Sequence, residues 1–359
     1  MDGMQETQAD REARRPKLIY PFESGPEVGT GQTVDVAPGV KWLRMPLGGP
    51  LGFINVWAIE DGEGWALVDT GLQTRETAQA WRTALKPEGD LGGRPVTRMI
   101  VTHLHPDHIG LAGWMTRKFG CRLWMTRLEY FQCRMLVADT GREAPDDGMN
   151  FFAAAGWDEE ALENYKTRFG GFGKAIYQLP DSFRRLNDGE EFKIGAHTWR
   201  IVTGNGHSPD HACLYCPELK LLISGDQVLP RISSNVSVHP TEPDADPLSD
   251  WMSSCAKVKA AVPDDVLVLP AHNDPFHGLH ARLDHLINGH ERSLGRLEKS
   301  LATPKRAIDV FGALFARPIG PELLGMATGE GLAHLNCLIE RGKAVAEKDE
   351  QGVVWYRAA

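Results

Sequence analysis

The sequence predicts an α/β fold in which a large domain is followed by a small, mainly helical one. Between about residues 34 and 300, short apolar segments of strand type alternate with amphipathic helical segments. After Pro304 the pattern changes to three helical segments and a hairpin. A chain of 359 residues also exceeds the size at which a single hydrophobic core stops growing. We therefore expect a large domain over residues 17–300 and a second over residues 301–359.

The strand and helix signals of the large domain follow one another along the chain. Runs of β-forming residues bounded by Asp, Gly or Pro predict strands at residues 52–61, 64–71, 97–103, 190–204, 212–216, 220–226 and 264–272. Apolar residues three and four positions apart predict helices at residues 76–86, 110–120 and 278–302. Residues 125–178 are largely helical in pattern, and we expect them to form an inserted helical lid over the loops of this domain.

The C-terminal segment has the outline of a winged helix. Helical patterns at residues 304–316, 320–327 and 330–344 precede a hairpin at residues 344–358. Winged helices bind nucleic acid, form dimers or pack against a neighbouring domain. We favour packing against the large domain, with a homodimer as an open alternative.

The composition is that of a soluble globular protein, with 42% hydrophobic and 24% charged residues. The net charge of −9 weakly disfavours nucleic acid as a partner. No apolar run has the length of a membrane span, and residues 1–16 form a polar stretch that we expect to be a disordered tail. We therefore expect a cytoplasmic protein with no membrane partner.

The six cysteines are scattered along the chain, and two of them, Cys213 and Cys216, form a CxxC pair. No second pair and no neighbouring pair of histidines completes a zinc knot. We interpret these thiols as packed and reduced, and a redox role for this pair stays open.

The stretch VTHLHPDHIGLAG at residues 101–113 places three histidines and an aspartate directly after a buried strand. Imidazole and carboxylate groups are ligands of zinc, iron and manganese. His103 and His105 point the same way where the backbone is extended, whereas Asp107 and His108 fall on the turn into the next helix. One loop can therefore serve two adjacent metal ions.

Further candidate ligands occur in the same setting, where an apolar strand emerges into a loop. His207 follows IVTGNG, Asp226 ends KLLISGD and His272 ends VLVLPAH. This recurrence predicts that the loops meet at one rim of a sheet and complete a metal site.

The motifs VDTG, THLHPDHIG, GHSPDH, SGD and PAH occur in an order that resembles the metallo-β-lactamase superfamily, over about Val34 to His290. The resemblance implies an αββα sandwich with two metal ions at one edge. It implies that the first ion is held by His103, His105 and His207, and the second by Asp107, His108 and His272. Asp226 would bridge the two ions, and Asp69 would support the site without binding a metal.

Two positions depart from the superfamily pattern, because Asn273 and Asp210 stand where glycine is common. Neither departure removes a ligand, but both could reshape the substrate pocket. The long helix and the C-terminal segment also resemble the subgroup near glyoxalase II and the β-lactamase-like endoribonucleases.

Two ions about 3.5–4 Å apart can share a hydroxide, because coordination lowers the pKa of water from about 16 to about 7. We predict a dinuclear metallo-hydrolase in which this hydroxide attacks a small ester-type substrate. Asp107 would orient the nucleophile and move a proton. Zinc is the preferred cofactor, with iron or manganese as alternatives.

We expect a small-molecule substrate, with a thioester first and a lactone or ester second. Arg231 and Asn235 follow the bridging aspartate and are candidates for contacting the substrate, since a guanidinium suits a carboxylate or phosphate. The plainer interpretations are a surface ion pair for Arg231 and a loop-capping amide for Asn235. His211 is either a polar neighbour of the metal ligands or a histidine at a strand edge.

Two other functions remain open. An endoribonuclease would use the same two ions and agrees with the winged helix, but the predicted wing, EKDEQG, is acidic. An iron-dependent sulfur dioxygenase would typically use a single iron, whereas candidate ligands for a second ion are present here.

Overall fold

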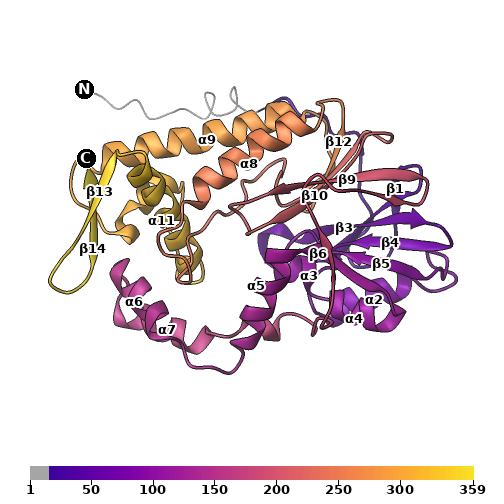
Figure 1. Cartoon of the computed structure of the whole chain (residues 1–359), viewed down its shortest axis with the longest axis horizontal. Coiled ribbons are helices and arrows are strands. Elements are labelled where there is room, and N and C mark those ends of the chain that lie inside the picture. The colour runs from indigo at the N-terminus through magenta and orange to yellow at the C-terminus, as the bar shows by residue number, and fades with distance from the viewer. Residues whose placement is uncertain (1–15) are drawn as a thin grey trace.

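A computed structural model describes residues 16–359, and these residues form two packed sheets covered by helices on both outer faces (Figure 1). Apart from Pro16, the predicted tail at residues 1–16 lies outside the described residues. The layers therefore follow the order helix, sheet, sheet, helix. The predicted αββα architecture is confirmed.

The first sheet has seven strands in the order β1 to β7. Strands β1 to β4 pair antiparallel and β4 to β7 pair parallel. Their bounds are β1 Val34–Ala37, β2 Val40–Pro46, β3 Phe53–Asp61, β4 Gly64–Val68, β5 Val96–Ile100, β6 Arg122–Thr126 and β7 Arg184–Leu186. A short 3-10 helix, η1, spans Gly49–Leu51 between β2 and β3.

Helices α2 (Arg75–Ala84), α4 (Ala112–Phe119) and α5 (Arg127–Ala138) cover the outer face of this sheet. Their apolar residues share one buried core with the sheet. The short helix α3 (Pro106–Ile109) precedes α4, and α4 ends at Gly120, whose left-handed φ of 63° favours glycine.

The second sheet has five strands in the order β12-β11-β10-β9-β8. Its neighbours pair antiparallel, except that β11 and β12 are parallel. Helices α8 (Pro247–Ala261) and α9 (Leu279–Ser300) pack on its outer face. The strand bounds are β8 Glu191–Ile194, β9 His197–Gly204, β10 His211–Cys216, β11 Leu221–Gly225 and β12 Leu267–Pro270.

The inner faces of the two sheets bury a core rich in tryptophan. Trp42 and Trp57 of the first sheet stack with ring centroids 6.1 Å apart, and Trp199 of the second sheet joins the same core. Successive side chains of a strand point to opposite faces, so Ile201 enters this inner core while Val202 faces the helices. This packing fixes the two sheets against each other and aligns the strand ends that carry the candidate ligands.

The inserted segment and the C-terminal segment contain the remaining elements. The insertion holds α6 (Asp146–Ala154), α7 (Glu159–Arg168) and the 3-10 helix η2 (Phe172–Lys174) after α5. The C-terminal segment holds η3 (Ala307–Val310), α10 (Phe311–Leu314), α11 (Leu324–Glu340) and the antiparallel hairpin β13 (Ala344–Lys348) and β14 (Val354–Ala358).

The C-terminal helices differ from the sequence prediction. The patterns at residues 320–327 and 330–344 belong largely to one continuous helix, α11. In the sequence, Gly329 and Gly331 suggest that a helix is interrupted at this point. In the structure, both glycines lie within α11. A Cβ at position 329 would lie 2.7 Å from the Ser237 side chain. Tertiary packing therefore explains why glycine occupies this helical position.

Among residues 16–359, no helix is both long enough and apolar enough to cross a membrane. All six cysteines are free. Cys213 packs in the core under the helices and Cys216 in the core between the sheets, so the two thiols of the CxxC pair point to opposite faces of β10. Burial raises the pKa of the Cys216 thiol to about 11.

Candidate metal centre

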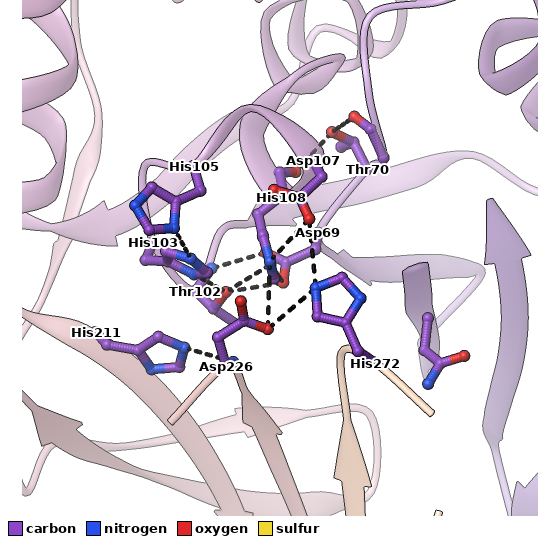
Figure 2. A network of polar contacts seen from close by, with 12 residues as sticks. Asp69, Thr70, Thr102, His103, His105, Asp107, His108, His211, Asp226 and His272 are labelled. Carbon is purple, nitrogen blue, oxygen red and sulfur yellow. Dashed lines mark hydrogen bonds and ion pairs between the residues drawn. The ribbon is translucent and has the colours of Figure 1, made fainter. Parts of the chain in front are cut away.

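The loops with the candidate ligands leave both sheets at one rim. The first loop follows the end of β5 at Ile100, and the others follow the ends of β9, β11 and β12. Helix α3 begins at Pro106, so Asp107 and His108 lie in its single turn. Figure 2 shows the side chains that follow β5, β11 and β12 pointing toward one another, among them His108, Asp226 and His272.

Two sets of side chains converge at this rim, and in each set the candidate ligand atoms lie within 4.8 Å of one another. The first set is His103, His105, His207 and Asp226, and the second is Asp107, His108 and His272. The structure thus brings together all seven side chains that the sequence singles out as ligands.

Asp226 lies between the two sets. Its Oδ2 is 3.4 Å from Nε2 of His207 in the first set. Its Oδ1 is 3.6 Å from Nε2 of His108 and 3.5 Å from Nε2 of His272 in the second set. The two oxygens of one carboxylate therefore face the two sets.

The donor set fits divalent cations better than it fits a hydrogen-bonded core. His108 Nε2, His207 Nε2 and Asp226 Oδ1 are buried and have no hydrogen-bond partner. A buried polar atom without a partner costs free energy, and native proteins rarely leave several in one place. Imidazole nitrogens and carboxylate oxygens that converge in this way are typical ligands of zinc and related ions.

The electrostatics differ between the two sets. Burial, assisted by the imidazole of His207, lowers the pKa of His105 to about 3. The pKa of His103 is also well below its ordinary value, through burial and the neighbouring imidazoles. For His272 burial acts in the same direction, but Asp226 and Asp107 outweigh it and raise the pKa to about 10. Burial thus keeps His103 and His105 neutral, whereas the carboxylates of Asp226 and Asp107 stabilise positive charge at His272.

Asp69 holds His108 in one orientation. Its Oδ2 lies 2.8 Å from His108 Nδ1 and accepts a hydrogen bond from the Thr102 hydroxyl, also at 2.8 Å. Its Oδ1 accepts a hydrogen bond from the Thr102 backbone N–H. When Nδ1 donates to Asp69, the lone pair of Nε2 points at the other candidate ligands.

His211 lies against the candidate bridging residue. Its Nε2 accepts a hydrogen bond of 3.1 Å from the backbone N–H of Asp226. Gly225 makes room for this contact, because a Cβ at that position would clash with the His211 ring. The φ of Gly225, 49°, also favours glycine.

The two predicted substrate residues have partners within the protein. Arg231 lies 3.3 Å from Asp274, and its side chain is 58% exposed, so its guanidinium stays accessible from solvent. The side-chain amide of Asn235 donates to Glu330 at 2.9 Å and accepts from the Ser237 hydroxyl at 2.7 Å. Asn235 is therefore engaged by the protein itself.

Glu129 belongs to the site but was missed by the sequence analysis. It lies in α5, is fully buried, and accepts hydrogen bonds from the Leu104 and Asp210 backbone N–H groups and the Ser208 hydroxyl. It thereby joins the loop of His103 and the loop of His207. No local signal distinguishes this glutamate from the exposed acidic residues of other helices.

The two departures from the superfamily pattern have structural counterparts. Asn273 adopts a left-handed φ of 67°, a conformation that favours glycine and that asparagine tolerates better than most residues. Its carbonyl accepts a hydrogen bond from the Asn55 side chain, which holds the backbone directly after His272. Asp210 contributes its backbone N–H to the bond with Glu129.

Comparison with known proteins agrees with this geometry. A sequence model described as the Metallo-beta-lactamase superfamily matches residues 49–272, which include all seven candidate ligands. The chain belongs to the metallo-beta-lactamase superfamily. A second model, the metallo-beta-lactamase-like C-terminal domain, matches residues 294–359. Superfamily membership together with the two ligand sets identifies the chain as a metal-dependent hydrolase.

Two solved structures are similar to this protein over nearly the whole chain. A beta-lactamase domain protein from Burkholderia ambifaria is 38% identical, with a TM-score of 0.86 over 96% of this chain and 98% of that one. A metallo-beta-lactamase family protein from Thermus thermophilus is 26% identical, with a TM-score of 0.75 over 90% of this chain and 100% of that one.

Two curated relatives have assigned activities. One is the acyl-coenzyme A thioesterase MBLAC2 of Gallus gallus, 25% identical over 66% of this chain and 79% of the relative. The other is an atrochrysone carboxyl ACP thioesterase of Aspergillus fumigatus, 30% identical over 36% of this chain and 28% of the relative.

Proposed function

We propose that the chain hydrolyses acyl thioesters at a centre of two divalent metal ions, with zinc as the resident metal. The observation that carries the metal centre is the position of Asp226, whose two oxygens face two separate sets of donors. The thioester is proposed first because two relatives that act on different carriers, coenzyme A and an acyl carrier protein, are both named thioesterases. Lactones and simple esters are the second choice of substrate.

The positions of the candidate ligands indicate which of the two ions each residue would bind. His103, His105 and His207 would hold the first ion, and Asp107, His108 and His272 would hold the second, with Asp226 shared. Bound at these positions, divalent ions supply an activated water as the nucleophile and polarise the substrate carbonyl.

Asp107 is the residue that we propose to orient the nucleophile and move its proton. Its side chain is 19% exposed, against 0% for His108 and 4% for His272, so it is the most accessible side chain of the second set. Burial raises the pKa of Asp107, but His108 and His272 outweigh this effect and hold the pKa below its ordinary value. An ionised carboxylate can accept a proton.

Other residues orient the ligands and the substrate. Asp69 fixes the tautomer of His108, and His211 holds the backbone of Asp226. Arg231, whose exposed guanidinium lies beside Asp274, would attract a carboxylate or phosphate of the substrate. The helices of residues 125–178 would form the lid of a catalytic domain spanning residues 17–300. Residues 301–359 would form a winged-helix-like domain, because α11 is followed directly by the β13–β14 hairpin.

The function is tested with the full-length, zinc-loaded protein. We expect free thiol to be released from acyl-coenzyme A, faster than an equivalent lactone or ester is opened. Two parallel assays test the alternatives. One measures cleavage of a labelled single-stranded RNA, and the other measures oxygen uptake by the iron-loaded protein with a persulfide as substrate. Cleavage of RNA, or oxygen uptake with iron, in the absence of thiol release would overturn the thioesterase proposal.

A further inference from the structure

The segment at residues 233–238 lies between the candidate metal centre and the C-terminal helix α11. On the side of the metal centre, His207 Nδ1 is 2.7 Å from the backbone carbonyl of Asn235 and donates to it. The hydroxyl of Ser234 donates to the backbone carbonyl of Asp226. This segment therefore contacts a ligand of the first set and the carboxylate residue shared by both sets.

On its other side the same segment is held by α11. The amide of Asn235 donates to Glu330 Oε2 at 2.9 Å, and the backbone N–H of Val238 donates to the carbonyl of Gly329 at 3.1 Å. The backbone of Glu330 is also held within α11, because His334, one turn later, donates its Nδ1–H to the Glu330 carbonyl at 2.8 Å. Side-chain and backbone bonds thus connect α11 with the residue that orients His207.

The close approach of the two elements depends on Gly329. A Cβ there would lie 2.7 Å from both Cβ and Oγ of Ser237, a separation that real Cβ atoms do not show. Two positions along the same helix, a Cβ at Gly331 would have its nearest neighbour, the Ala307 carbonyl oxygen, at 3.4 Å. Helix α11 therefore packs closely against the segment at residues 233–238 at position 329, but not at position 331.

The orientation of His207 depends on the Asn235 carbonyl. A neutral imidazole donates from one nitrogen and accepts or binds metal with the other. Since Nδ1 donates to Asn235, the lone pair lies on Nε2, which is buried without a hydrogen-bond partner and is 3.4 Å from Asp226 Oδ2. A shift of the Asn235 backbone would rotate this imidazole away from the other ligands.

We propose that Glu330 of α11 is a positioning residue for the metal centre, which acts through Asn235 to fix the imidazole of His207. The C-terminal helix thereby sets the affinity of the first ligand set, and the C-terminal domain is a structural part of the centre. This inference rests on the metal centre of the proposed function and is independent of the substrate.

The test measures metal binding by the full-length protein without substrate. Metal-free protein is titrated with zinc against a chromophoric chelator and with cobalt, whose visible spectrum reports ligand geometry. We expect Glu330→Ala to weaken binding at the first site by about 10-fold and to change the cobalt spectrum, since residues behind metal ligands typically contribute 10- to 100-fold. Glu330→Gln should remain near wild type, because its amide oxygen still accepts the Asn235 bond.

A second pair of variants separates positioning from helix stability. Gly329→Ala and Gly331→Ala raise helix propensity equally, and we expect only Gly329→Ala to weaken metal binding. Unchanged affinity and an unchanged spectrum in Glu330→Ala would overturn the inference. If that variant does not fold, the same result in Gly329→Ala would overturn it. A wild-type protein that binds no metal would refute the proposed function itself.

Discussion

Glu129 and Leu104 are joined by a hydrogen bond of 2.8 Å, from the Leu104 backbone N–H to Glu129 Oε2. The second carboxylate oxygen of Glu129 accepts from Ser208 and Asp210 on the other side. A single buried side chain thus sets the distance between two loops that carry candidate ligands. The metal centre is therefore supported from α5 as well as from the two sheets.

Replacing Glu129 by glutamine turns an amide N–H toward at least one of its buried donors. Leaving a buried hydrogen-bonding group unsatisfied costs about 1–3 kcal/mol, so we expect Glu129→Gln to lower the free energy of unfolding by that amount. Urea unfolding measures this value. Glu163→Gln, at an exposed position in α7, is the matched control and should change it by less than about 0.5 kcal/mol. Equal stabilities of the two variants would contradict this account.

Asp107→Asn removes the proposed proton acceptor while preserving the shape of the side chain. Because general-base catalysis typically contributes 100- to 10,000-fold, we expect kcat for thioester hydrolysis to fall by at least about 100-fold. Circular dichroism should be unchanged. His105→Ala should also abolish turnover, through loss of the first metal. Full activity in either variant would exclude the proposed mechanism.

Removal of the metal should affect stability as well as turnover. A ligand present at about 1,000 times its Kd stabilises the native state by about 4 kcal/mol. We therefore expect a chelator to lower Tm and abolish thiol release, and added zinc to restore both. Elemental analysis should find two metal ions per chain. A Tm that does not respond to the chelator would argue against a centre built from these seven side chains.

The stability of the protein should also depend on the ionisation of Glu330. Burial raises the pKa of Glu330 to about 7 from an ordinary value of 4.5, although the Asn235 amide opposes the shift. The native state therefore holds the proton more tightly than the unfolded state does. This contribution is complete below pH 4.5 and is lost as the pH rises through about 7.

Comparing wild type with Glu330→Gln isolates this effect, because other titrating groups are common to both proteins. Between about pH 4 and about pH 8, we expect the free energy of unfolding of wild type to fall by about 1–3 kcal/mol relative to the variant. Chemical denaturation at several pH values measures the difference. A difference that does not change with pH would show that Glu330 ionises normally.

Much of the site could be predicted from the sequence, because the relevant signals are local. The cluster from His103 to His108 lies within six positions, and His207, Asp226 and His272 each follow an apolar strand. Strand alternation and helical spacing are also local patterns, and they predicted most elements of the two sheets and the long helix α9.

The partners of individual polar groups could not be predicted in this way. Glu129 resembles a surface glutamate in the sequence, and only its contacts with Leu104 and Ser208 distinguish it. The sequence offered Asn235 either as a substrate contact or as a loop-capping amide, and it did not indicate that the partner of this amide is Glu330, in a helix 95 positions later in the chain. In the sequence, Gly329 resembles a residue that ends a helix. Only the packing of Ser237 against it explains why glycine is needed inside α11.

The sequence by itself determined which side chains can bind metal and where strands end, since residue chemistry and periodicity act over a few positions. The tertiary structure decided which carboxylate is buried, which imidazole nitrogen is free and which glycine is required. Those properties depend on burial and on hydrogen bonds between segments far apart in the chain, and no local pattern encodes such contacts.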